Sequence, residues 1–173
     1  MFFYIAQGIS ILTALVAVFM MQFKTMEKIL AGQILANVLT ASTYFLLGGF
    51  SGAGICFIAI VQSIAMFVFA KKQTQVKMPV VLTFVGLYLA CAWISYQSYI
   101  DLFSALAAVC FAFSVAAKNP KLSRRWYVLN PVCWMVYDIA TRAYGNFIIH
   151  AVVFVSTFSA ILRLDMHKKG ESK

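Results

Sequence analysis

The residues best suited to chemistry in this sequence are amides and aromatic rings, set at regular spacing inside long apolar runs. Between residues 29 and 50 they recur every three or four positions, which places them on one face of a helix. These residues are Gln33, Asn37, Thr40, Tyr44 and Gly48. Amides can hydrogen-bond a solute and rings can stack on it, so this face suits recognition of a small polar molecule.

A matching stripe occupies one face of the run 126–144, at Asn130, Trp134, Tyr137 and Asp138. Polar side chains within a bilayer usually face a partner or a cavity. We therefore predict a cavity between the two stripes, near the middle of the membrane. The residues expected to bind the solute are Asn37, Tyr44, Asn130, Trp134 and Tyr137. The alternative is hydrogen bonding between helices, which contributes only about 0.6–2 kcal/mol per contact.

Three further residues of the run 126–144 are candidates for a hinge or a gate. Pro131 removes a backbone donor and clashes with the preceding turn, so it predicts a kink. Asp138 and Arg142 are four residues apart, a spacing that permits a salt bridge. The pair fits an outer gate. Alternatively, Arg142 extends to the membrane surface and Asp138 neutralises it.

The sequence lacks the patterns that mark an enzyme, a metal site or a cofactor site. Its four cysteines stand singly in apolar runs, without a CxxC pair or a Cys/His cluster. Paired intramembrane acids and the HExxH and GxSxG motifs are missing as well. We expect no catalytic activity, no metal and no cofactor.

The elements that must position these residues are transmembrane helices. Of 173 residues, 63% are hydrophobic and 11% are charged, whereas soluble domains carry roughly 25% charged residues. A span needs about 20 mostly apolar residues, and only helices or closed barrels satisfy the backbone within a bilayer. The runs lack the alternation of barrel strands. The predicted spans are 3–22, 29–50, 53–70, 79–96, 102–117, 126–144 and 147–164.

The charged residues between the runs predict the orientation. Thirteen of the 14 Lys and Arg residues fall on one side of seven successive crossings, and Arg142 alone falls on the other. Because basic residues stay in the cytoplasm, the N-terminus is expected outside and the C-terminus inside. This distribution favours the lipid bilayer as the partner and argues against nucleic acid.

An odd number of spans also allows two parallel halves. We predict a single transmembrane domain over 1–173, with triple-helix repeats at 1–72 and 101–165, a linker helix at 73–100 and a cytoplasmic tail at 166–173. Parallel repeats of this kind are a recurring plan of transporters. A shift of 93 residues aligns Asn37 with Asn130 and Tyr44 with Tyr137.

Several short motifs resemble the YgjV-type bacterial inner-membrane proteins. They are Gln7-Gly8, Lys24 with Lys28, Leu46-Leu47-Gly48 with Gly52-Ala53, and Cys133-Trp134. The resemblance implies a multi-pass protein of the bacterial inner membrane. Where that family is expected to carry an arginine in the third span, this chain has Gln62.

The three-one-three plan is also similar to the SWEET and PQ-loop transporters, which implies facilitated movement of a small solute as two bundles rock. The Pro-Gln pair of those families is missing here. We therefore expect an all-α small-solute transporter or facilitator. The alternative is a non-transporting membrane accessory, assembly or stress protein, whose partner would be a second copy of the chain or another membrane protein. It would act through helix contacts, such as the small-residue stripe at Ser104, Ala108, Ala112 and Ala116.

Overall fold

A computed structural model describes residues 2–46, 50–94, 96, 98–140 and 144–166. These residues form helices and short links, without a strand in the described ranges. The helices are α1 (Phe2–Met20), α2 (Met26–Leu46), α3 (Phe50–Lys71), α4 (Met78–Ile94), α5 (Asp101–Val115), α6 (Pro120–Tyr127), α7 (Leu129–Ala140) and α8 (Tyr144–Ala160), with a final π-helical segment η1 (Ile161–Met166). The all-helical prediction is confirmed.

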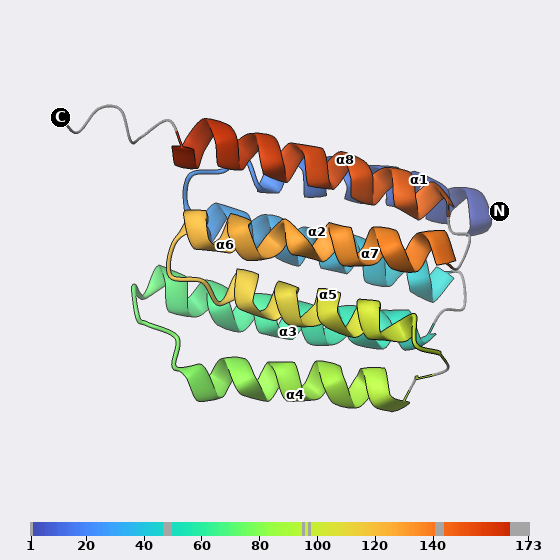
Figure 1. Cartoon of the computed structure of the whole chain (residues 1–173), viewed down its shortest axis with the longest axis horizontal. Helices are drawn as coiled ribbons and strands as arrows, with labels where there is room; N and C mark the ends of the chain where they lie inside the picture. Colours follow the sequence, from blue (N-terminus) through green and yellow to red (C-terminus); the bar gives the residue numbers. More distant parts are fainter. Residues whose placement is uncertain (1, 47–49, 95, 97, 141–143, 167–173) are drawn as a thin grey trace.

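The helices form two layers, with α4 at one edge (Figure 1). One layer holds α1, α2 and α3, and the other holds α5, α6 with α7, and α8. Between the layers, α1 contacts α8, α2 contacts α6, and α3 contacts α5. Helix α4 packs on α3 and α5. The stripe on α2 and the stripe on α7 therefore belong to different layers.

The sixth apolar run departs from its predicted bounds because α6 begins at Pro120, six residues before the expected start at 126. The side chain of Asn119 caps α6 by accepting a hydrogen bond from the Leu122 amide at 2.9 Å, and proline is favoured at the first helical position. The helix is then interrupted at Val128. Pro131 has no N–H to donate to the carbonyl four residues earlier, which explains an interruption there.

Helices α1 and α2 approach closely because of one glycine. A Cβ added at Gly32 would lie 2.5 Å from the Cβ of Met20. Met20, Met21, Ile29 and Leu30 surround this contact and are at most 1% exposed. Only glycine permits this separation of the two backbones.

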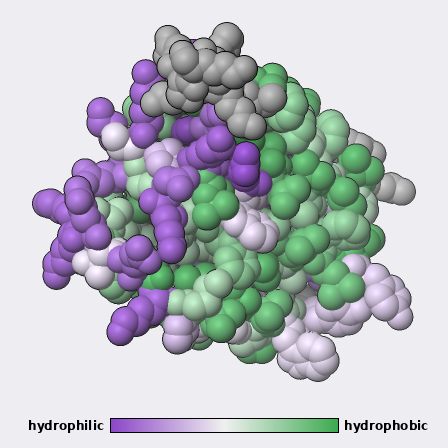
Figure 2. Space-filling model, turned by 60° about the vertical axis from the view of Figure 1, so that its left-hand side comes forward, coloured by the Kyte–Doolittle hydropathy of each residue, from purple (hydrophilic) through white to green (hydrophobic). Residues whose placement is uncertain are grey.

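Much of the outer surface is apolar. Phe57, Trp93, Ile94 and Val155 each expose more than 60% of their surface, and Figure 2 shows hydrophobic side chains over much of one flank. Within the described residues, Gly54–Lys71 and Phe147–Asp165 are long and apolar enough to cross a membrane, judged by length and composition. Shorter apolar helices lie at Tyr4–Met20, Met78–Ile94 and Asp101–Val115.

The basic side chains are gathered at one end of the bundle. In the described ranges they occupy the link 21–25, the first turn of α2, the last turn of α3, the links 72–77 and 116–119, helix α6 and η1. These segments meet at the left of Figure 1, and hydrophilic side chains gather there in Figure 2. We call this end, with Lys24, Lys71, Lys118, Arg125 and Arg163, the basic end.

Candidate functional site

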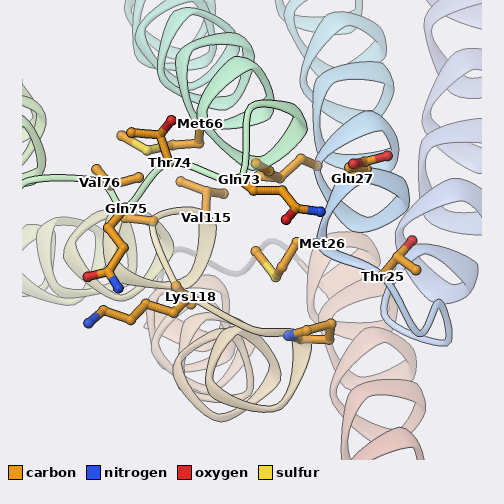
Figure 3. Close-up of a pocket in the computed structure, with 15 residues that line it drawn as sticks. Thr25, Met26, Glu27, Met66, Gln73, Thr74, Gln75, Val76, Val115 and Lys118 are labelled. Carbon is orange, nitrogen blue, oxygen red and sulfur yellow. The ribbon is translucent and has the colours of Figure 1, made fainter.

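The basic end contains a cavity of about 520 Å³ between the two layers, which we call the vestibule. Its walls come from the start of α2, the end of α3 with the following link, and the link from α5 to α6 (Figure 3). Gln73, Gln75 and Thr74 contribute neutral polar groups. The charged lining residues are Glu27 and Lys118, one of each sign. The vestibule therefore carries no net charge from its lining.

An apolar layer closes the deep side of the vestibule. Leu30 of α2, Met66 of α3 and Val115 of α5 line the cavity, yet they are only 1%, 1% and 2% exposed. We call these three residues the floor. Two of them come from one helix layer and the third from the other, so the floor lies at the seam between the layers.

Polar side chains are buried one turn deeper than the floor. Gln33 lies three residues beyond Leu30, and Gln62 and Ser63 lie four and three residues from Met66. At a rise of 1.5 Å per residue, these offsets correspond to about 4.5–6 Å along the helix axes. Their exposed fractions are 2%, 0% and 0%. We call Gln33, Gln62 and Ser63 the polar layer.

Contacts of the polar layer bridge the two helix layers. The Nε2 atom of Gln62 donates to the carbonyl oxygen of Ala112 on α5 at 3.2 Å. The side chain of Gln33 lies close to that of Tyr127 on α6, which is itself buried. Gln62 thus links α3 to α5 across the two layers.

Each residue of the polar layer nevertheless retains a buried polar atom without a hydrogen-bond partner. These atoms are Nε2 of Gln33, Oε1 of Gln62 and Oγ of Ser63. Leaving such an atom unpaired costs about 1–3 kcal/mol, so buried polar atoms without partners are rare and call for a physical reason. Within the described residues, Tyr88 supplies the one other atom of this kind.

Ser63 departs from the behaviour of most other hydroxyl side chains in these helices. Those side chains usually donate to the carbonyl oxygen four residues earlier, the local bond that satisfies a hydroxyl in a helix. This bond is made by Ser10, Thr13, Thr40, Ser42, Thr43, Thr83 and Thr157. Ser63 does not make it. Its hydroxyl is therefore free to bind something else.

The two asparagines of the predicted solute-binding site lie near the polar layer, and each makes a hydrogen bond of its own. The Nδ2 atom of Asn37 donates to the carbonyl of Gln33 at 2.8 Å, within α2. Asn130 is buried and donates to the carbonyl of Ala107 on α5 at 2.9 Å. No described contact joins Asn37 to α7. Both asparagines lie about one turn deeper than Gln33 and Tyr127.

The aromatic part of the predicted site faces α8. Trp134 stacks on His150 with ring centroids 5.8 Å apart, and its contact with Tyr137 is edge-on at 5.7 Å. The Trp134–His150 contact joins α7 to α8 within one layer, whereas the Trp134–Tyr137 contact lies within α7. The side chains of Tyr44 and Asp138, and the whole of Arg142, lie outside the described residues.

A buried ion pair at the basic end was missed by the sequence reasoning. Arg124 donates from Nε and Nη2 to the two carboxylate oxygens of Asp165, at 3.1 and 2.6 Å, and both side chains are 4% exposed. Nη1 also donates to the carbonyl of Phe23 at 2.9 Å. The pair joins α6, η1 and the α1–α2 link. The signal available was an acid, Asp165, at the end of the last apolar run in a largely basic terminus.

A second polar contact holds α1 against α8. Gln22 donates from Nε2 to the carbonyl of Ser156 at 2.8 Å, and the Ser156 hydroxyl donates to the carbonyl of Val18 at 2.6 Å. Arg163 donates to the Oε1 atom of Gln22. Both polar groups of this glutamine are paired, in contrast to the glutamines of the polar layer.

Comparison with known proteins places the chain in a family. No curated protein and no solved structure matches it. Residues 4–168 match the family Imp-YgjV, described as a bacterial inner membrane protein. The apolar flank and the basic end agree with a membrane location. Because the match covers nearly all of its 173 residues, the chain belongs to the Imp-YgjV family of bacterial inner membrane proteins.

Proposed function

We propose that this protein moves a small polar solute across the bacterial inner membrane, as a facilitator of SWEET-like plan. The observation that carries the proposal is the vestibule, which enters the seam between the two helix layers and ends above buried polar groups.

The helix arrangement supports a division into two parallel halves, residues 1–72 and 101–165, with α4 as the linker. In Figure 1 the order α1, α2, α3 in one layer runs opposite to the order α5, α7, α8 in the other. A two-fold axis parallel to the helices would exchange α1 with α5, α2 with α7 and α3 with α8. Transporters built from parallel repeats hold the solute at the interface between the repeats.

In this proposal the solute passes from the vestibule through the floor and then past Asn37 and Asn130. Tyr44, Trp134 and Tyr137 complete the deeper part of the path. The interruption before Pro131 allows α6 and α7 to bend relative to each other. Asp138 and Arg142 are proposed to act as the gate at the far end. The N-terminus lies outside and the vestibule opens to the cytoplasm, following the basic end.

The small-residue stripe of α5 does not favour the accessory function. Ala112 has no exposed surface, and its carbonyl accepts the hydrogen bond from Gln62. Ala108 and Ala116 pack against the same core. The small residues of this stripe therefore pack against other helices of the same chain.

The test is solute-dependent stabilisation of the purified protein, because a solute that binds the folded state raises its melting temperature. A panel of neutral and charged small solutes is expected to include at least one that raises Tm. Asn37→Leu and Asn130→Leu should remove this shift, and Thr83→Leu, at an exposed position of α4, should retain it. A panel without any shift contradicts the proposal.

A further inference from the structure

We propose that the polar layer, Gln33, Gln62 and Ser63, binds a small uncharged solute that carries hydroxyl or amide groups. This inference rests on the proposed transport function and specifies its binding site and its class of substrate. Neither the stripes in the sequence nor the family match assigns a role to these three residues together.

The unpaired atoms define what the solute must offer. Nε2 of Gln33 is a donor, Oε1 of Gln62 is an acceptor, and Oγ of Ser63 is both. A partner must therefore both accept and donate hydrogen bonds. Hydroxyl and amide groups do so, whereas an apolar molecule would leave all three atoms unpaired.

The charges around the polar layer favour a neutral solute. The polar layer carries no formal charge, and neither do the neighbouring Tyr127 and Ala112. The closest buried charges along α6 and η1, Arg124 and Asp165, neutralise each other through two hydrogen bonds. An ion in the polar layer would have no counter-charge, and burying an unpaired ion is strongly unfavourable.

The position of the polar layer suits a site that opens and closes. Only the floor separates it from the vestibule, and one floor residue is the flexible side chain of Met66. The Gln62–Ala112 hydrogen bond crosses the seam, and Gln33 lies close to Tyr127 of the other layer. Separation of the layers at the basic end would break these contacts and expose both amides to a solute entering from the vestibule.

A change of glutamine to methionine separates a binding role from a structural role. Gln33→Met and Gln62→Met keep the length of the side chain and remove its unpaired atom. If these amides exist to bind solute, Gln33→Met leaves Tm without solute unchanged or raises it, since a buried unpaired donor is removed. Gln62→Met also loses the hydrogen bond to Ala112, so its Tm should fall by less than that of Gln22→Met. Gln22→Met is the matched control, because both polar groups of Gln22 are paired, and it should lower Tm while solute uptake is retained.

The experiment measures uptake of glucose, glycerol and urea by proteoliposomes that contain the full chain. Gluconate and glucosamine serve as the negatively and positively charged counterparts of glucose. The wild-type protein is expected to take up at least one neutral probe, and neither charged probe at a comparable rate. Each methionine variant in the polar layer should reduce uptake about tenfold or more, the effect of losing one good hydrogen bond.

Three results would overturn the assignment while leaving transport itself in place. They are unchanged uptake by both Gln33→Met and Gln62→Met, equal uptake of gluconate or glucosamine, and a fall in Tm of both variants that matches Gln22→Met. A protein that takes up none of the five probes, and whose Tm no solute raises, contradicts the transport function and this inference together.

Discussion

At the scale of single residues, the buried ion pair of Arg124 and Asp165 joins segments that are far apart in the sequence. Arg124 and Asp165 form two hydrogen bonds away from solvent, and Arg124 also binds the carbonyl of Phe23. Removal of one member of such a pair leaves the other charge buried and unpaired. The pair therefore ties three segments of the basic end to one another.

We expect Asp165→Ala to lower the free energy of unfolding by about 3–5 kcal/mol, because Arg124 loses its counter-charge. The double variant Arg124→Met with Asp165→Leu should recover much of this loss, since neither charge remains. Denaturant unfolding in detergent measures both effects. Arg125→Met, at the exposed neighbouring position, is the control and should change stability little. Equal stability of Asp165→Ala and the wild type would show that the pair is not holding the basic end.

The sequence indicated some of these residues and missed others for a physical reason. Gln33 and Asn37 were recognisable because polar groups in an apolar run stand out. Ser63 was not, because serine is common in membrane helices and only its missing local hydrogen bond distinguishes it. Asp165 was overlooked because its partner is 41 residues away in the chain. Pairings of this kind depend on tertiary structure, which spacing does not encode.

At the scale of helices, the close approach of α1 and α2 depends on Gly32. The added Cβ in Gly32→Ala would lie against the Cβ of Met20, an atom next to the backbone that a rotamer change cannot move away. We expect a loss of stability of about 1–3 kcal/mol, typical of overpacking. Thermal unfolding in detergent measures it.

Two other glycines provide matched controls for that variant. A Cβ at Gly54 or Gly86 meets nothing within 4 Å. Gly54→Ala and Gly86→Ala should therefore leave stability unchanged or raise it by up to about 1 kcal/mol, through helix propensity alone. If Gly32→Ala is as stable as these variants, the close approach of α1 and α2 does not contribute to stability.

Helix positions were predictable, whereas some helix ends were not. The apolar runs marked α1, α3, α4 and α5 to within a few residues. The run 126–144 gave no sign that its helix starts at Pro120, because 120–125 is basic rather than apolar. The capping side chain of Asn119 and the proline after it were the local signals for that start.

At the scale of the whole molecule, the two layers and the vestibule between them were beyond what hydropathy can predict. Hydropathy shows which segments are apolar, but not which helices face each other. The two predicted stripes were expected to share a cavity. In the structure Asn37 bonds within α2, and Trp134 faces α8. The unpaired polar atoms instead gather one turn below the vestibule floor.

The account as a whole requires the vestibule to open to the cytoplasm and to respond to the solute. Single-cysteine proteins test this, made after the four native cysteines are replaced by alanine. Gln75→Cys places a thiol in the vestibule, and Tyr99→Cys places one at the opposite end, where Tyr99 is exposed. Both are treated with a membrane-impermeant maleimide in inside-out and right-side-out vesicles.

We predict that Gln75→Cys reacts only in inside-out vesicles. Its reaction should be slower when a transported solute is present, because the two helix layers close around the bound solute. Tyr99→Cys should react only in right-side-out vesicles. Reaction of Gln75→Cys from the outer face would contradict the orientation and the proposed entry route. A rate that no transported solute changes would contradict movement of the two layers.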